Sequence, residues 1–527
     1  MTIKQIKQVV LVVLTFVSLS LAALSLFGSI NQPQVQSRLE LYQTNLLLHA
    51  TEYQFDQSTD DAQSDLVNLR QTLLGEKPLQ TAQKQYQKAR QETQTNTKDL
   101  QAQLQQLANI EIEALAQSNI QQQQILQQKI TEAQSYLNEL DLHIGILQVS
   151  QGQIDTAQET WQKLIERNLP EESVPQFRQT ANTLRGLWSQ SPLTSSFTQE
   201  QITTNLDGWF RYRALQQLYT LQQSDDNLTN LRTQEQQSAQ KALLKLALIA
   251  AIPTLGGFAG AGLLIFLGIQ WLLKRQDSLI GAGVGTPWSC SWDGEIIWQV
   301  MIVGFFFISQ ILLPFILVPI LVKVVGLNLG AMGLRGQAIS VLVSYLLMTL
   351  GGLAVLYWSL KPFSPLNEEW FRFQINFKGI SWGVGGYLVA LPLVVIVSLL
   401  NQQIWQGQGG SNPIILLALQ AQDRLALAIF FFTASIAAPL FEEIIFRGFF
   451  LPSLTRYIPV WVSIVFSSFV FALAHLSLSE VLPLATLGMV LGFVYTRSRN
   501  LLAPMLLHSL WNGGTLLSLF ILGSGVG

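Results

Sequence analysis

The chain has 527 residues, of which 49% are hydrophobic and only 12% are charged. Because soluble proteins carry about 25% charged residues, this composition indicates a membrane protein and excludes an ordinary soluble enzyme. The formal net charge of −2 provides no electrostatic basis for nucleic-acid binding, and the single cysteine, Cys290, excludes an intrachain disulfide and a cysteine-rich metal site.

The first predicted element is an apolar run at 9–30, which is about as long as a helix that crosses a bilayer. Lys4 and Lys7 precede it, as basic residues precede the apolar core of a secretory signal peptide. The run is longer than such a core and lacks an A-x-A cleavage site. We therefore predict that residues 1–30 form an uncleaved membrane anchor.

Residues 31–240 are polar and rich in glutamine, with leucines at helical spacing and few prolines or glycines. This pattern favours an α-helical domain over a low-complexity tract. The segment IGILQVSQGQIDTAQETWQKLIERNLP resembles a tetratricopeptide repeat. The residues close to the positions favoured by that repeat are Gly145, Gly152, Ala157, Trp161 and Pro170. We expect such a domain to provide a surface that binds a protein partner and to carry out no chemistry of its own.

Residues 241–527 form the predicted polytopic membrane domain. Eight further spans are expected at about 246–273, 296–322, 338–360, 383–400, 425–450, 458–478, 481–496 and 500–523. The predicted fold class is therefore all-α: one N-terminal anchor helix and about eight transmembrane helices, with a helical, TPR-like extramembrane domain.

Lysine and arginine in the short loops predict the orientation, because such residues are in excess on the cytoplasmic side. With the N-terminus in the cytoplasm, the cytoplasmic loops contain Lys274, Arg275, Lys361, Arg372, Lys378, Arg456, Arg497 and Arg499. The opposite side contains Lys323, Arg335 and Arg424. We predict an integral protein of a bacterial inner membrane or a thylakoid-like membrane, with residues 31–240 extracytoplasmic.

Three ionisable residues stand in the apolar stretch FEEIIFRGFF, where each charge costs roughly 2.5–3.5 kcal/mol at a helix centre. Glu443 and Arg447 are four residues apart on one helix face and can neutralise each other. Glu442 points about 100° away and has no local cation. An unpaired carboxylate of this kind can serve as a general base, although a purely structural ionic contact between helices is the alternative.

Two more polar motifs follow in later spans. FALAH ends on His475, and HSLWN places His508 and Asn512 on one helix face. A histidine and an amide side by side can orient a water or hold an oxyanion, whereas hydrogen bonding between helices is the structural alternative. None of the earlier spans contains a histidine, so the clustering favours function.

Together, EEIIFR, FALAH and HSLWN resemble the three signature motifs of the CPBP family of intramembrane proteases. This family comprises the type II CAAX prenyl endopeptidases and the bacteriocin-processing (Abi) proteins. The resemblance covers about residues 290–523 and is most specific in 441–512. It implies an endopeptidase that hydrolyses a peptide bond of a membrane-associated protein or peptide through a water activated by glutamate and histidine.

The resemblance also implies residue roles. Glu442 would be the general base, and His475 would position or polarise the water. His508 and Asn512 would complete the site and could hold the oxyanion. The residues expected to keep the site in shape are Glu443, Arg447 and Phe471.

The motif residues allow two mechanisms, one with a catalytic zinc and one without a metal. Glu442, His475 and His508 match a common catalytic zinc set, but HExxH is missing and an amide such as Asn512 is a poor zinc ligand. A metal-free glutamate mechanism is the alternative that we favour. With straight helices Glu442 and His475 would lie at different depths, so a tilt or a break near Pro439 or Pro459 is expected.

Two other functional classes compete with the protease. A catalytically inactive membrane scaffold or sensor would use the same residues as a packed polar core. A transporter would use glutamate and histidine as a proton relay, but the spans show no internal repeat. The expected partners are a protein or peptide substrate, membrane lipid and a protein bound by residues 31–240.

Overall fold

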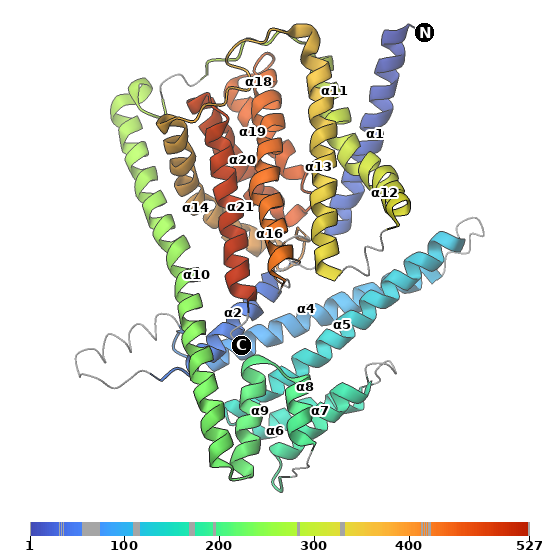
Figure 1. Cartoon of the computed structure of the whole chain (residues 1–527), viewed down its shortest axis with the longest axis vertical. Coiled ribbons are helices and arrows are strands. Elements are labelled where there is room, and N and C mark those ends of the chain that lie inside the picture. Colours follow the sequence, from blue (N-terminus) through green and yellow to red (C-terminus); the bar gives the residue numbers. More distant parts are fainter. Residues whose placement is uncertain are drawn as a thin grey trace. The chain divides into compact units, whose positions relative to one another are not determined.

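The structure is a computed structural model of the whole chain. Its described part is helical and contains no strand (Figure 1). The described residues are 2–30, 32, 34, 36–54, 74–108, 116–167, 174–192, 197–281, 285–326, 333–412, 415, 417, 419 and 423–524. They fall into two compact units. We call Met1–Gln34 with Ala251–Gly523 the membrane unit, and Val35–Ala250 with Ser524–Gly527 the helical unit.

The helical unit is built from antiparallel helices around one apolar core. Its helices are α2 (Gln36–Thr51), α4 (Pro78–Ala108), α5 (Ala116–Ser150), α6 (Ile154–Glu166), α7 (Val174–Leu187), α8 (Thr198–Asn205), α9 (Gly208–Leu221) and the first half of α10 (Asp225–Lys274). Trp161, Trp209 and Phe210 are fully buried in this core. His143 is buried with them, and its ring stacks on that of Phe210 at a centroid distance of 3.9 Å.

The repeat-like segment forms a helical hairpin of α5 and α6. Gly152 occupies the turn with φ +77°, a left-handed conformation that favours glycine. The Trp161 indole N–H donates to the carbonyl of Leu142 at 3.3 Å, and a Cβ on Gly145 would overlap the indole ring. Glycine at 145 is therefore what lets the two helices approach. Pro170 lies outside the described residues.

The membrane unit contains the anchor helix and the remaining apolar helices. In chain order these are α1 (Ile3–Ser29), the second half of α10, η2 (Arg275–Asp277), α11 (Gly294–Gln299), η3 (Val300–Leu317), α12 (Val318–Val325), α13 (Gly333–Leu360), η4 (Lys361–Phe363), α14 (Phe377–Trp405), α16 (Arg424–Phe432), η5 (Thr433–Ala437), α17 (Ala438–Glu443), η6 (Ile444–Phe450), α18 (Leu451–Leu454), α19 (Val460–Leu473), η7 (Leu478–Glu480), α20 (Val481–Ser498) and α21 (Leu502–Gly523).

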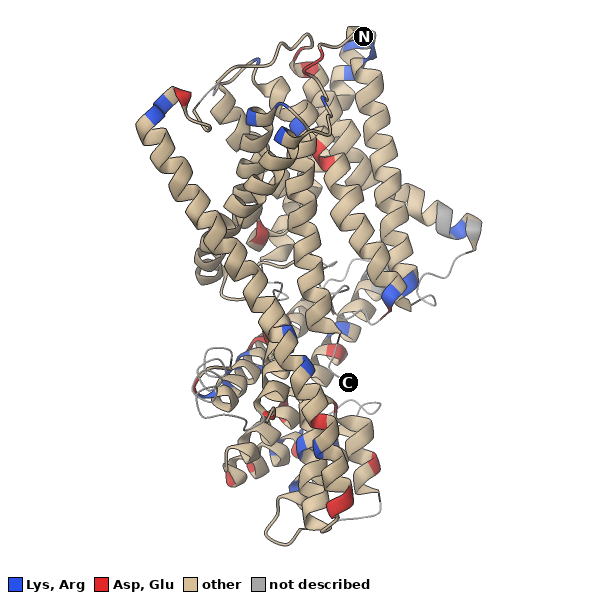
Figure 2. Ribbon diagram, turned by 60° about the vertical axis from the view of Figure 1, so that its left-hand side comes forward, with Lys and Arg blue, Asp and Glu red and all other residues tan. Residues whose placement is uncertain are grey.

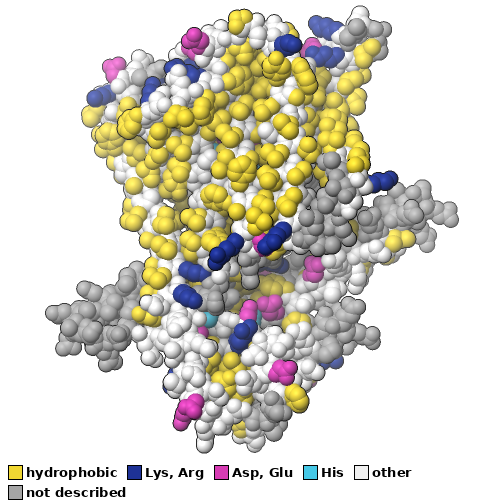
Figure 3. All heavy atoms as spheres, viewed as in Figure 1, with side chains coloured by type: hydrophobic (Ala, Val, Ile, Leu, Met, Phe, Trp, Pro, Cys, Tyr) yellow, Lys and Arg dark blue, Asp and Glu magenta, His cyan; other side chains and the backbone are white. Residues whose placement is uncertain are grey.

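Within the described residues, eight helices are long and apolar enough to cross a membrane. They are Lys4–Ser29, Asp225–Asp277, Gly294–Ile320, Gly333–Phe363, Phe377–Trp405, Arg424–Leu454, Leu478–Ser498 and Leu502–Gly523. Figure 3 shows hydrophobic side chains covering the outer surface of these helices in a broad band, as a surface in contact with lipid requires. The predicted fold class, an all-α polytopic membrane protein, is confirmed.

The expected span at 458–478 differs from the structure. Helix α19 has 14 residues, Val460–Leu473, and is the one apolar helix of 10–17 residues in the described part of the membrane unit. At 1.5 Å per residue it is about 21 Å long, less than the roughly 30 Å of a hydrocarbon core. Pro459 precedes its first turn, and the left-handed Leu476 (φ +57°) prevents its continuation.

Lysine and arginine residues gather at the end of the membrane unit that contains the N-terminus (Figure 2). Lys7 pairs there with Glu295 at 2.9 Å, and Arg499 pairs with Glu369 at 3.4 Å. The cytoplasmic assignment of this end stays a prediction.

Candidate active site

The helix from Arg424 to Leu454 carries the two adjacent glutamates and is not a regular α-helix. Two π-helical segments, η5 and η6, flank the short α17. Each π turn widens the helix, and such segments occur frequently at functional sites. Glu442 and Glu443 are the last two residues of α17, so they stand directly between the two irregular segments.

Glu443, Arg447 and His508 form a buried ionic cluster. Arg447 Nη1 donates to Glu443 Oε1 at 2.9 Å, and His508 Nδ1 lies 2.8 Å from the same oxygen. The side chain of Arg447 is 1% exposed, that of Glu443 is 0% exposed and that of His508 is 3% exposed. The expected ion pair between Glu443 and Arg447 is therefore present. The contact between His508 and Glu443 also holds α21 against the helix that carries the two glutamates, which we call the glutamate helix.

Arg447 is held from two further directions. Its Nη2 donates to the Gly488 carbonyl of α20 at 3.2 Å, and its guanidinium lies 4.5 Å from the ring centroid of Phe471 on α19. Charge on a buried guanidinium is stabilised by a carboxylate, a carbonyl and an aromatic face. One side chain thus connects four helical segments.

Glu443 also determines how His508 is presented. Because Nδ1 faces a carboxylate, we assign the proton of the neutral imidazole to Nδ1. Nε2 then faces Glu442, with 3.9 Å between Nε2 and Glu442 Oε2. This separation is too long for a direct hydrogen bond.

Glu442 itself is bound through one oxygen only. Its Oε1 accepts a hydrogen bond of 2.9 Å from the hydroxyl of Tyr345 on α13. Its Oε2 is buried and has no hydrogen-bond partner among the described residues. Tyr345 was missed by the sequence analysis; the available signal was a phenol in the middle of the apolar span 338–360.

His475 lies just beyond the C-terminal end of α19. Its Nδ1 is 2.9 Å from the carbonyl oxygen of Phe471. The Phe471 ring makes edge contacts with both His475 and His508, at centroid distances of 4.9 and 5.8 Å. The two histidines are thus one aromatic ring apart, but no hydrogen bond or ion pair joins His475 to Glu442 in the part of the chain that the structure describes.

The loop that follows His475 is bound to two other segments of the membrane unit. Ser479 N donates to the carbonyl of Gly409 at 3.2 Å, and Asn401 Nδ2 donates to the carbonyl of Ser479 at 2.6 Å. Gly409 N in turn donates to the carbonyl of Ile30 at 3.1 Å, at the end of the anchor helix. The anchor is therefore part of the frame that positions the His475 loop.

Asn512 stands one turn after His508 and contacts an earlier part of the helix that carries the two glutamates. Its Nδ2 donates to the carbonyl of Ala434 in η5 at 2.8 Å. The neighbouring Ser435 hydroxyl is buried without a partner among the described residues, and a Cβ on Gly513 would lie 3.5 Å from it. Asn512 thus has one N–H committed to the backbone and one available.

The zinc set suggested by sequence does not converge. Among the described residues, no group of three or more His, Cys, Asp or Glu side chains could hold a metal ion. Glu442 and His508 approach each other, but His475 does not join them. The donor arrangement therefore does not fit a three-ligand catalytic metal.

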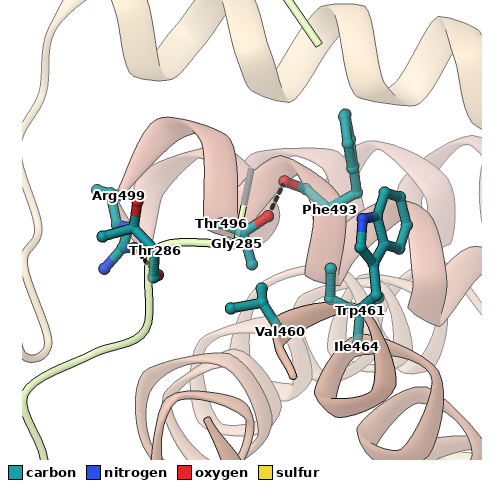
Figure 4. A pocket seen from close by; sticks show the side chains of 8 residues that line it. All are labelled: Gly285, Thr286, Val460, Trp461, Ile464, Phe493, Thr496 and Arg499. Carbon is teal, nitrogen blue, oxygen red and sulfur yellow. Dashed lines mark hydrogen bonds between the residues drawn. The ribbon is translucent and has the colours of Figure 1, made fainter. Parts of the chain in front are cut away.

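Figure 4 shows a separate hollow between α19 and α20, of about 10 Å³. It is lined by Gly285, Thr286, Val460, Trp461, Ile464, Phe493, Thr496 and Arg499, none of which belongs to the three motifs. Its volume is sufficient for about one water molecule. We assign it no part in the site.

Known proteins are similar to this chain in the region that contains the three motifs. Residues 424–514 match the family described as Type II CAAX prenyl endopeptidase Rce1-like. This segment is a CPBP-family domain. The CPBP resemblance of the three motifs is thereby confirmed, and the domain contains the whole ionic cluster and both motif histidines.

Two curated proteins are similar to part of the chain. The Membrane-embedded CAAX protease MroQ of Staphylococcus aureus (strain USA300) is 29% identical over 140 residues, which is 25% of this chain and 56% of that protein. The protein named Putative membrane peptidase YdiL of Bacillus subtilis (strain 168) is 26% identical over 135 residues, 25% of this chain and 53% of that protein. The chain thus spans about half the length of the curated relatives it matches. No solved structure matches.

Proposed function

We propose that this protein is an intramembrane endopeptidase that hydrolyses a peptide bond of a membrane-associated protein or peptide. The CPBP-family domain and the two relatives named as a protease and a peptidase support this function. The observation that carries the proposal is the free Oε2 of Glu442, which faces His508 Nε2 across 3.9 Å inside the membrane unit.

A hydrolytic water can bridge these two atoms from one side of the line that joins them. A water oxygen about 2.8 Å from each of them makes two hydrogen bonds of ordinary length. Glu442 takes one proton as the water oxygen attacks the carbonyl carbon, and the carbonyl becomes a tetrahedral oxyanion. Glu442 then returns the proton to the amide nitrogen as the C–N bond breaks, so the products are a carboxylic acid and an amine.

The other motif residues have supporting roles in this scheme. The free N–H of Asn512 donates to the oxyanion, and His508 Nε2 accepts a hydrogen bond from the attacking water. His475 positions the water or the scissile carbonyl from the loop after α19. Glu443 and Arg447 hold His508 in orientation, and Phe471 packs between the two histidines.

The test uses the full-length chain in liposomes with a library of apolar peptides of about 20 residues, the length that crosses a bilayer. We expect fragments from the wild type and a loss of about 10²–10⁴-fold in the Glu442→Gln variant. Glu369→Gln is the matched control, because Glu369 is a partly exposed surface carboxylate paired with Arg499. Equal cleavage by Glu442→Gln would refute the assignment of the base.

The competing function is an inactive scaffold or sensor. It predicts that Glu442→Gln and His508→Ala lower the yield of folded protein and that the wild type cuts no peptide. The protease predicts lost cleavage with normal yield. Size-exclusion profiles of the variants, recorded beside the cleavage assay, distinguish the two.

The helical unit is proposed to bind a protein partner or to recruit the substrate. A polar pocket of about 110 Å³ supports this role, lined by Val149, Ser150, Trp188, Arg213, Gln216, Gln217 and Thr220. Arg213 hydrogen-bonds Ser150 Oγ and Gln216 Oε1, and no carboxylate pairs with it among the described residues. In the proposed orientation the N-terminus is cytoplasmic and this unit extracytoplasmic; a reporter fused to the C-terminus that reads as cytoplasmic would contradict it.

A further inference from the structure

Among the described residues, Tyr345 makes the one hydrogen bond to the Glu442 carboxylate, and it lies outside the CPBP-family segment. It stands in the middle of α13, 97 residues before Glu442, and its hydroxyl donates to Oε1 at 2.9 Å. Its ring also meets Phe441 edge-on at a centroid distance of 6.3 Å. Neither the three motifs nor residues 424–514 include it.

The packing of α13 makes this contact a fixed feature of the bundle. Two turns beyond Tyr345, Gly352 lies so close to α17 that a Cβ there would approach Phe441 Cζ to 2.8 Å. The same Cβ would meet the carbonyl oxygen of Gly304 on η3 at 2.8 Å. A glycine wedged between two helices sets the distance of α13 from the glutamate helix, and this distance brings the phenol within reach of Oε1.

The hydrogen bond has a directional consequence. A glutamate carboxylate turns freely about its last torsion unless one oxygen is bound. With Oε1 bound to Tyr345, the second oxygen points away from α13 and toward His508 Nε2 on α21. The remaining charged groups near Glu442 are Glu443 and Arg447 on its own helix, and these bind each other.

We propose that Tyr345 is a positioning residue that holds the Glu442 carboxylate with Oε2 directed at His508 Nε2, where the hydrolytic water bridges the two side chains. This inference rests on the proposed function. It implies that the reaction needs a residue of α13, so the family segment alone does not contain the complete site. Tyr345 touches neither water nor substrate in this scheme and acts only through Glu442.

The experiment compares Tyr345→Phe with a matched variant, Tyr495→Phe. Tyr495 is also buried, but its hydroxyl has no hydrogen-bond partner among the described residues. Both changes remove one oxygen and keep an aromatic ring. Cleavage of the peptide selected in the library assay is measured in liposomes, with kcat and KM determined separately.

We expect Tyr345→Phe to lower kcat about 10- to 100-fold with KM within about twofold, because the base loses its orientation while substrate binding is retained. Tyr495→Phe should match the wild type. Replacement of Tyr345 by p-aminophenylalanine, which restores an N–H donor, should recover most of the loss. A kcat of Tyr345→Phe equal to that of the wild type would overturn the inference, as would a folded but inactive p-aminophenylalanine variant.

A double-mutant cycle separates positioning from general structure. In a Glu442→Asp background the shorter carboxylate no longer reaches the phenol, so adding Tyr345→Phe should cost less than threefold more. A full additional loss would mean that Tyr345 acts elsewhere. If Tyr345→Phe is silent while Glu442→Gln is inactive, only this inference fails; if Glu442→Gln stays active, the proposed function itself fails.

Discussion

The buried cluster around Arg447 yields a sharp prediction about stability. Replacing Arg447 by Met keeps most of the side-chain volume but leaves the Glu443 carboxylate, 0% exposed, without its cation. Removal of one partner of a buried ion pair costs about 3–5 kcal/mol, because the remaining charge stays desolvated. The variant also loses the hydrogen bond to Gly488 and the contact with the Phe471 ring. We expect a total loss in the upper part of that range.

The second variant of this test is Arg447→Met combined with Glu443→Gln. It removes both charges, so the desolvation penalty disappears and most of the lost stability should return. Unfolding in mixed micelles, followed by tryptophan fluorescence, measures both variants against the wild type. If Arg447→Met loses less than about 1 kcal/mol, or if the double variant is less stable than the single one, the charge argument is wrong.

Three further predictions concern the helical unit. Burial lowers the pKa of His143 to about 4, so the unfolded chain, with an ordinary value near 6.5, binds more protons between these limits. The contribution of His143 to the free energy of unfolding is therefore full above pH 6.5 and falls by about 1.4 kcal/mol per pH unit down to pH 4. Hydrogen exchange in α5 should show this dependence on pH, and His143→Phe should remove it. Gly145→Ala should destabilise the α5–α6 hairpin by about 1–3 kcal/mol, because the added Cβ overlaps Trp161. Gly152→Asn should lower the stability of the hairpin less, because asparagine tolerates a left-handed φ. The same hydrogen-exchange experiment measures both variants. Arg213→Glu should abolish crosslinking of a partner to a photoreactive group placed at Thr220, with Arg211→Glu on the same helix as control; unchanged crosslinking would exclude the pocket.

Local patterns in the chain were sufficient for several features. The apolar runs predict membrane helices because, in lipid, the backbone N–H and C=O groups of each run must be hydrogen-bonded within the run itself. The pairing of Glu443 with Arg447 follows from four-residue spacing on one helix, which needs no knowledge of the other helices. The hairpin around Gly152 is equally local. The three motifs also sufficed to recognise the CPBP family.

Tertiary structure decided how these parts meet. Spacing cannot reveal that Tyr345 reaches Glu442, because that contact depends on a glycine-sized approach between α13 and α17. The same holds for the bond from His508 to Glu443, which joins helices 65 residues apart in the chain.

Hydropathy also did not predict the length of α19. Apolar residues continue past Leu473, but the helix ends there and the chain turns at the left-handed Leu476. His475 stays beside Phe471, which is four residues earlier. The sequence by itself determined which polar groups are placed in the membrane, because their cost and their helical spacing are local properties. Which atom of each group faces which partner depends on helix depth, rotation and packing, and these properties arise only when the bundle is assembled.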